Sequence, residues 1–110
     1  MKCKLLTDGL IKTYGYFDGE VKIASCILRE KIRGEFKGSY SLEKVFIEEE
    51  YRGRGLCTKF LECIFKKKEY SGKTIFLDVL QNNEPAIKCY TNLGFKEIDK
   101  GRSTLYMRKN

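Results

Sequence analysis

The sequence of 110 residues has no histidine and no tryptophan, and it has only one proline. Without histidine, zinc sites that combine Cys with His and nucleophiles activated by a His base are excluded. No apolar run approaches the about 20 residues that a membrane-spanning helix needs, and residues 1–10 contain no apolar stretch typical of a signal peptide. We therefore expect a protein with no metal site and no membrane segment.

Five cysteines share apolar surroundings, and they are Cys3, Cys26, Cys57, Cys63 and Cys89. Their number is odd, and no two of them have the Cys-x-x-Cys spacing that is typical of metal or redox motifs. The simplest interpretation is that all of them are free thiols in a reducing compartment. The cysteines therefore predict a cytoplasmic protein without disulfides.

Basic residues outnumber acidic ones, with 22 Lys and Arg against 15 Asp and Glu, which gives a formal net charge of +7. This charge favours an anionic partner, either a nucleic acid or a phosphorylated cofactor. At 42% hydrophobic residues, a chain of this length can bury one core and not two. We therefore expect a single domain over residues 1–110.

The hydrophobic pattern predicts an α/β fold with a mixed sheet and two main helices. Strands are predicted at 11–17, 21–27, 42–47, 74–80, 95–99 and 104–108. The first two strands are joined by Asp18-Gly19, a strong hairpin signal. An apolar stripe over 56–65 predicts a helix that connects two parallel strands. A second helix is predicted from Asn82 or Asn83 to Leu93, where Gly94 ends it.

A glycine-rich turn, Arg52-Gly53-Arg54-Gly55, separates the strand at 42–47 from the helix at 56–65. Glycines let the backbone N–H groups of such a turn approach an anion, and the start of the helix adds free N–H groups and a positive dipole end. A pyrophosphate is the ligand that this arrangement favours, although an ordinary tight turn would have the same pattern. The P-loop and dinucleotide fingerprints do not match, because the Gly-Lys-Ser/Thr ending is missing and Thr58 replaces a third glycine or alanine.

Two motifs together resemble the GNAT superfamily of N-acetyltransferases. The coenzyme A loop of that family, Gln/Arg-x-x-Gly-x-Gly/Ala, is matched by Arg52-Gly53-Arg54-Gly55-Leu56-Cys57, with Cys57 as the last small residue. The second motif is matched by Leu77-Asp78-Val79 followed by Asn83-Glu84-x-Ala86-Ile87-x-x-Tyr90-x-x-x-Gly94-Phe95. The resemblance covers residues 42–95. The pair of helices that normally follows the first strand of the family is absent.

The resemblance implies a single GNAT-like domain with a mixed, mostly antiparallel sheet and a splayed pair of parallel strands. The unpaired backbone of the strand at 42–47 would bind the pantetheine arm of acetyl-coenzyme A, and the glycine turn would bind its pyrophosphate. The guanidinium of Arg52 or Arg54 would bind the 3′-phosphate. The residues implied in cofactor binding are Val45, Phe46, Ile47, Arg52, Gly53, Arg54, Gly55, Leu56, Cys57, Thr58, Asn83 and Tyr90.

The resemblance also implies direct transfer of the acetyl group to a primary amine, with general acid and base assistance. Tyr90 matches the usual proton donor to the departing sulfur, and a backbone N–H of Phe46 or Ile47 would stabilise the oxyanion. Asp78, whose pKa we expect its apolar neighbours to raise, is one candidate base, and Glu43 is the other. The acceptor stays open between a small amine, a peptide N-terminus and a protein lysine.

Two alternatives remain at this stage. Because the absent helices usually form one wall of the acceptor site, the chain could bind coenzyme A without catalysis, or could act with a partner such as a second copy in a homodimer. A nucleic-acid-binding module would also fit the charge of +7 and the seven tyrosines and seven phenylalanines. Against the latter, Glu48-Glu49-Glu50 lies beside the basic turn and would repel a phosphate backbone.

Overall fold

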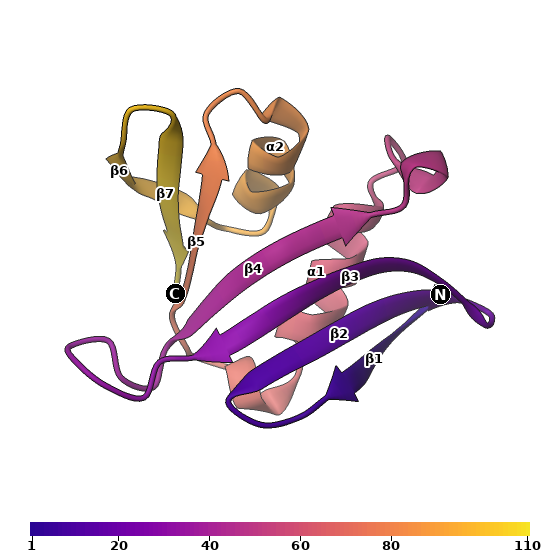
Figure 1. Cartoon of the computed structure of the whole chain (residues 1–110), viewed down its shortest axis with the longest axis horizontal. Helices are drawn as coiled ribbons and strands as arrows, with labels where there is room; N and C mark the ends of the chain where they lie inside the picture. Colours follow the sequence, from indigo (N-terminus) through magenta and orange to yellow (C-terminus); the bar gives the residue numbers. More distant parts are fainter.

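The computed structural model describes residues 1–110, which form one seven-stranded sheet in the order β1-β2-β3-β4-β5-β7-β6 (Figure 1). The strands are β1 (Lys2–Thr7), β2 (Ile11–Asp18), β3 (Val21–Glu30), β4 (Tyr40–Ile47), β5 (Ile75–Leu80), β6 (Lys96–Lys100) and β7 (Thr104–Lys109). The helices are α1 (Leu56–Phe65) and α2 (Glu84–Asn92), with short 3-10 turns at Glu49–Tyr51 and Lys68–Tyr70. Only β4 and β5 run parallel. The predicted α/β fold with a mixed, mostly antiparallel sheet is confirmed.

The first three strands form an antiparallel meander. The predicted hairpin between β2 and β3 turns at Gly19, whose φ of 63° is easily adopted only by glycine. The sequence did not predict β1, which pairs with β2 after the short connection 8–10. This strand gave no signal because only Cys3 among its residues is even half-buried. No helices lie between β1 and β2, as expected.

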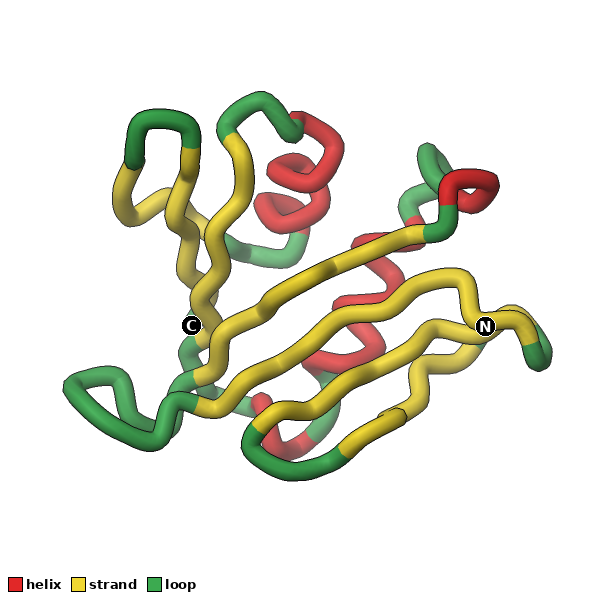
Figure 2. The backbone as a smooth tube through the Cα atoms, in the orientation of Figure 1, coloured by secondary structure: helices red, strands yellow, loops and turns green.

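Both α-helices pack on the same face of the sheet. Tyr16 of β2 stacks on Phe60 of α1, and Tyr40 and Leu42 of β4 are buried. The pairing of Tyr40 with Ile75 places the buried side chains of β5 on the same face as Tyr40. The opposite face carries no helix, and Figure 2 shows α1 behind the strands, with α2 beside β5. We call this uncovered side the open face. Neither helix has the length and apolar character that crossing a membrane requires.

The cysteines differ from the prediction. Disulfides join Cys3 of β1 to Cys63 of α1 and Cys57 of α1 to Cys89 of α2, so only Cys26 is a free, buried thiol. The prediction of five free thiols was wrong because the paired residues are 60 and 32 positions apart, and pairing over such distances cannot be deduced from spacing. The cysteine argument for a reducing, cytoplasmic compartment loses its basis as well.

Candidate functional site

The parallel strands β4 and β5 pair only at one end. Their ladder consists of Tyr40 with Ile75 and Ser41 with Phe76. Beyond these pairs the strands diverge, as Figure 1 shows. From Leu42 onward, the backbone edge of β4 that faces β5 therefore has no strand partner, and its N–H and C=O groups are available to a ligand. The predicted splayed pair is confirmed.

A β-bulge interrupts β4 where it leaves β5. Ile27 pairs with Glu43 and Ser25 pairs with Phe46, so β4 has one residue more than β3 between these pairs. Within the bulge, Lys44 has a φ of 51° and is the only non-glycine residue with positive φ. A left-handed backbone costs an L-residue about 1–2 kcal/mol. Bulges near sites often redirect the backbone, and strain of this kind concentrates at functional sites.

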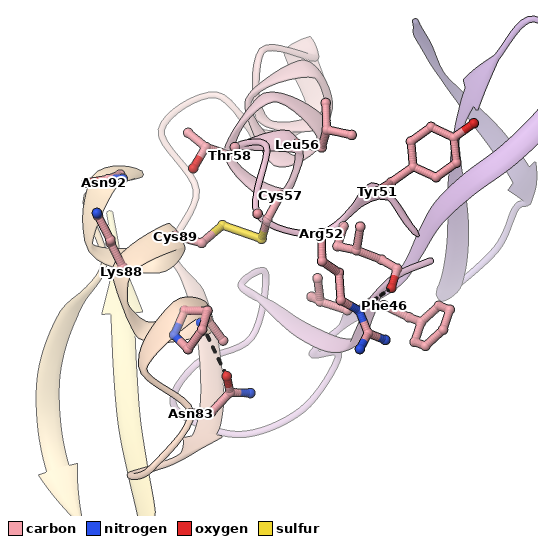
Figure 3. Close-up of a pocket in the computed structure, with 16 residues that line it drawn as sticks. Phe46, Tyr51, Arg52, Leu56, Cys57, Thr58, Asn83, Lys88, Cys89 and Asn92 are labelled. Carbon is pink, nitrogen blue, oxygen red and sulfur yellow. Dashed lines mark hydrogen bonds between the residues drawn. A yellow bond between two sulfur atoms is a disulfide. The ribbon is translucent and has the colours of Figure 1, made fainter. Parts of the chain in front are cut away.

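A cleft of about 680 Å³ lies between the end of β4, the start of α1 and α2 (Figure 3). All residues implied in cofactor binding line this cleft except Arg54 and Tyr90. The other lining residues were not implied in cofactor binding, and they are Tyr51, Pro85, Ala86, Lys88, Cys89 and Asn92. Most of these lie on α2, whose approach to α1 depends on the tertiary fold. We call this depression the cofactor cleft.

The start of α1 leaves its first N–H groups free at the wall of the cofactor cleft. Gly55 is the N-cap residue, and no side chain accepts a hydrogen bond from the first turn. Gly53 and Gly55 have φ values of 77° and 72°, so both glycines of the turn adopt the left-handed conformation. Free N–H groups and the positive end of the helix dipole favour an anion at this point.

The two arginines of the turn have different surroundings. Arg52 donates its Nε–H to the Ile47 carbonyl at 2.8 Å, and its guanidinium lies 5.4 Å from the centre of the Phe46 ring. The Arg54 guanidinium lies 5.3 Å from the centre of the Tyr51 ring and does not line the cleft. Arg52 therefore anchors the turn to β4, whereas Arg54 remains a cation beside the cleft.

Asn83 is the N-cap residue of helix α2, which settles the choice between Asn82 and Asn83. The Asn83 side chain accepts a hydrogen bond from the Ala86 N–H at 3.3 Å and also lines the cofactor cleft. The predicted cap is thus confirmed, and its position at the cleft is compatible with a ligand contact. Lys88, one turn further along α2, adds a positive charge to the same wall.

Tyr90 lies between α2 and the sheet, with only 7% of its surface exposed. Burial, with smaller contributions from Cys26 and Asp78, raises the pKa of Tyr90 to about 12. Its hydroxyl has no hydrogen bond to the protein, yet it is not sealed from solvent. The phenol is therefore protonated at neutral pH and free to donate its proton. Tyr90 does not line the cofactor cleft itself.

The two candidate bases lie on the open face, where β4 and β5 separate. Ser41 pairs with Phe76, so Glu43 and Asp78, each two residues further, point to the same face. Glu43 accepts hydrogen bonds from Arg29 at 3.0 and 3.3 Å, and these bonds lower the pKa of Glu43. Asp78 is exposed, so the apolar enclosure that we expected around its carboxyl is absent. That expectation was wrong because Leu77 and Val79, on either side of Asp78, point to the other face, and Leu80 is itself exposed.

Comparison with known proteins places this arrangement among acetyltransferases. The family model "Acetyltransferase (GNAT) family" matches residues 9–95, and no curated protein matches the chain. A PaiA N-acetyltransferase from Thermoplasma acidophilum in complex with coenzyme A has a TM-score of 0.77 and 22% identity, over 91% of this chain and 60% of that one.

Two further solved structures have the same fold. A ribosomal-protein-alanine N-acetyltransferase from Escherichia coli has a TM-score of 0.76 and 19% identity, over 94% of this chain and 70% of that one. YncA from Salmonella typhimurium, a putative acetyltransferase with acetyl-CoA, has a TM-score of 0.71 and 17% identity, over 89% of this chain and 63% of that one. The chain thus spans from 60% to 70% of the length of these three structures.

Proposed function

Because the chain belongs to the acetyltransferase (GNAT) family, we propose that it is an N-acetyltransferase that transfers the acetyl group of acetyl-coenzyme A to a primary amine. The observation that carries the proposal is the uncapped start of α1 at the wall of the cofactor cleft, beside the unpaired edge of β4. Two similar structures contain coenzyme A or acetyl-CoA, which supports the same cofactor here.

The cofactor cleft has the groups that a coenzyme A molecule requires. The N–H groups of Leu56, Cys57 and Thr58 would hold the pyrophosphate, and Lys88 would add attraction from the opposite wall. Along the free edge of β4, backbone C=O groups would accept hydrogen bonds from the pantetheine amides, and backbone N–H groups would donate hydrogen bonds to them. Bound acetyl-CoA supplies an activated thioester, and the bulge at Lys44 would orient a β4 N–H group toward the developing oxyanion.

Tyr90 is the proposed general acid. Its raised pKa keeps the phenol protonated, and its hydroxyl has no competing partner within the protein. A protonated donor within reach of the thioester would protonate the departing thiolate sulfur. Tyr90 also packs between α2 and the sheet, and this structural role is compatible with its role as general acid.

Asp78 is the proposed base, acting directly or through a water. It is preferred over Glu43 because Arg29 stabilises the charged form of Glu43, and a carboxylate with a lowered pKa is a weaker base. Both lie on the open face, so the acceptor amine would approach from that side while the cofactor enters from the helix side. Glu48, Glu49 and Glu50 line a separate depression at the end of β4 and would favour a cationic acceptor.

A charge substitution in the first turn of α1 tests the proposal. Thr58 is the third residue of α1, where an acidic side chain stabilises a helix but repels a bound pyrophosphate. We expect acetyl-CoA to raise the melting temperature of the native protein and Thr58→Glu to lose binding by about tenfold or more, which corresponds to ~1.4 kcal/mol. Thr58→Gln is the matched control, and it should retain binding.

Two results would contradict the proposal at different levels. If Thr58→Glu and Thr58→Gln bind acetyl-CoA with equal affinity, the phosphates of the cofactor do not lie at the start of α1. Binding without release of free coenzyme A thiol, across a panel of small amines, peptides and lysine-containing proteins, would favour the non-catalytic alternative.

A further inference from the structure

The Cys57–Cys89 disulfide joins the two walls of the cofactor cleft, and we propose that it is a redox-controlled clamp that fixes the width of this cleft. Cys57 lies in the first turn of α1 and Cys89 in α2, and both line the cleft. Their Cα atoms are 6.2 Å apart, and Figure 3 shows the bond between the two helices. The inference rests on the proposed function only in taking coenzyme A as the occupant.

The clamp matters because the sheet joins two parts of the molecule through a short seam. One part contains β1 to β4 with α1, and the other contains β5 to β7 with α2. In the sheet, they are joined only by the pairs Tyr40 with Ile75 and Ser41 with Phe76. Beyond this seam, the two parts are held together by side-chain packing, as between Phe65 and Phe95, whose ring centres are 6.1 Å apart. The disulfide adds a covalent link between the two helices at the cleft, where it limits how far its walls can separate.

The reduced state would be competent to reform the bond. Cys57 is the second residue of α1, and no side chain caps that helix start. The free N–H groups and the helix dipole favour a negatively charged sulfur at such a position, and a thiolate is the form that attacks a disulfide. Cys57 is only half-buried, so a reductant or oxidant has access to it from the cleft.

The redox step is an ordinary thiol–disulfide exchange. Two equivalents of a thiol reductant, or one dithiol, supply two electrons and two protons; the S–S bond breaks, Cys57 and Cys89 become thiols, and the reductant leaves as its own disulfide. A low-molecular-weight disulfide reverses the reaction. In the oxidised state the amides of α1 and the wall formed by α2 are held in place before a ligand binds, so binding has a smaller ordering cost.

The second disulfide provides a matched control. Cys3–Cys63 connects β1 to α1 within one part of the molecule, and neither cysteine lines the cofactor cleft. Removing it lowers stability without freeing the two walls of the cleft from each other. A change in hydrogen exchange or coenzyme A binding that requires Cys57–Cys89 but not Cys3–Cys63 is therefore specific to the clamp.

The experiment compares three proteins with and without a dithiol reductant: the native chain, Cys57→Ser/Cys89→Ser and Cys3→Ser/Cys63→Ser. Hydrogen exchange of segments 52–58 and 83–92 reports on the two walls, and titration with coenzyme A reports on affinity. We expect reduction of the native chain to accelerate exchange in both segments and to weaken binding about tenfold. Cys3→Ser/Cys63→Ser should respond in the same way, and Cys57→Ser/Cys89→Ser should behave as reduced protein under both conditions.

The two readouts separate failure of the clamp from failure of the proposed function. Unchanged exchange in the two segments after full reduction, confirmed by thiol labelling, overturns the clamp. Accelerated exchange with unchanged coenzyme A affinity overturns its control of binding. If coenzyme A binds neither form, the proposed function is wrong, and the exchange data still decide whether the disulfide holds the walls together.

Discussion

Arg52 donates its Nε–H to the backbone carbonyl of Ile47 at 2.8 Å. This bond ties the beginning of the glycine turn to the last residue of β4, so the glycine turn and the unpaired strand edge are fixed relative to each other. Arg54 has no comparable bond and lies over the Tyr51 ring at 5.3 Å. The two arginines of one motif should therefore contribute to binding in different ways.

Substitution of each arginine by glutamine should separate these contributions. Arg52→Gln is expected to weaken the binding of coenzyme A and of 3′-dephospho-coenzyme A equally, by about tenfold, because it loosens the turn. Arg54→Gln should weaken the binding of coenzyme A alone, by about threefold to tenfold, because an exposed cation on the 3′-phosphate contributes about 0.5–1.5 kcal/mol. Calorimetric titration with both ligands measures this, and the reverse pattern would assign the 3′-phosphate to Arg52.

Removal of the Tyr90 hydroxyl should lower kcat and leave the KM for acetyl-CoA nearly unchanged. Tyr90→Phe removes one hydroxyl and leaves the proposed pyrophosphate and pantetheine contacts in the cleft in place. General acid catalysis contributes about 10²–10⁴-fold, and we expect a loss in this range. Tyr16→Phe, at a buried tyrosine of β2 that stacks on Phe60 and does not line the cleft, is the control. Native kcat in Tyr90→Phe would show that another group protonates the sulfur.

The raised pKa of Tyr90 also predicts a loss of stability at high pH. In the unfolded chain a tyrosine titrates near 10, whereas in the folded protein the pKa of Tyr90 is about 12. Between these values the folded state binds more protons than the unfolded state, so the free energy of unfolding falls as pH rises. The contribution is about 1.4 kcal/mol per pH unit and about 2.7 kcal/mol in all.

Urea unfolding from pH 8 to pH 12 checks this effect. The native chain should lose stability more steeply than Tyr90→Phe above about pH 10, and the two should run parallel below it. Parallel curves over the whole range would mean that Tyr90 ionises as easily in the folded protein as in the unfolded chain.

The two carboxylates on the open face should differ in their effect on catalysis. Arg29 lowers the pKa of Glu43 through the hydrogen bonds that it donates, so Glu43→Gln should change kcat by less than about threefold. Asp78→Asn should reduce kcat by about 10²-fold or more, because it removes the proposed base. Rates against pH for both variants decide the assignment, and a larger loss in Glu43→Gln would reverse it.

Local signals in the sequence were sufficient for most elements. The stripe over 56–65 predicted α1 because its apolar spacing matches the helical period, and Asn83 and Gly94 marked the ends of α2 because each has a conformation or hydrogen bond that few other residues provide. The glycine turn and α2 were connected only through motif resemblance, since the two lie close together only in the folded chain.

What the sequence did not predict depends on contacts between distant segments. The disulfides join residues from three separate elements, and β1 is too exposed to show an alternating pattern. Asp78 was expected to be enclosed because its neighbours are apolar, but strand alternation directs it to a face that no helix covers. The bulge in β4 was missed because Lys44, and not glycine, occupies the left-handed position.

The strain at Lys44 leads to the last prediction. With a φ of 51°, lysine costs about 1–2 kcal/mol at this position, whereas glycine adopts the conformation freely but loses about 0.5–1 kcal/mol in chain entropy. Lys44→Gly should therefore stabilise the fold by about 0.5–1 kcal/mol, and Lys44→Val should destabilise it by about 1 kcal/mol or more, because a branched side chain is least tolerated with positive φ.

Lys22 is the matched control, because it is also exposed but lies in β3 without positive φ. Lys22→Gly should destabilise the fold by about 0.5–1 kcal/mol, the opposite sign to Lys44→Gly, as measured from urea midpoints. If Lys44→Gly keeps kcat while gaining stability, the left-handed backbone conformation, and not the lysine side chain, shapes the β4 edge for the acyl group. A loss of stability similar to that of Lys22→Gly would show that the bulge at Lys44 is not formed in solution.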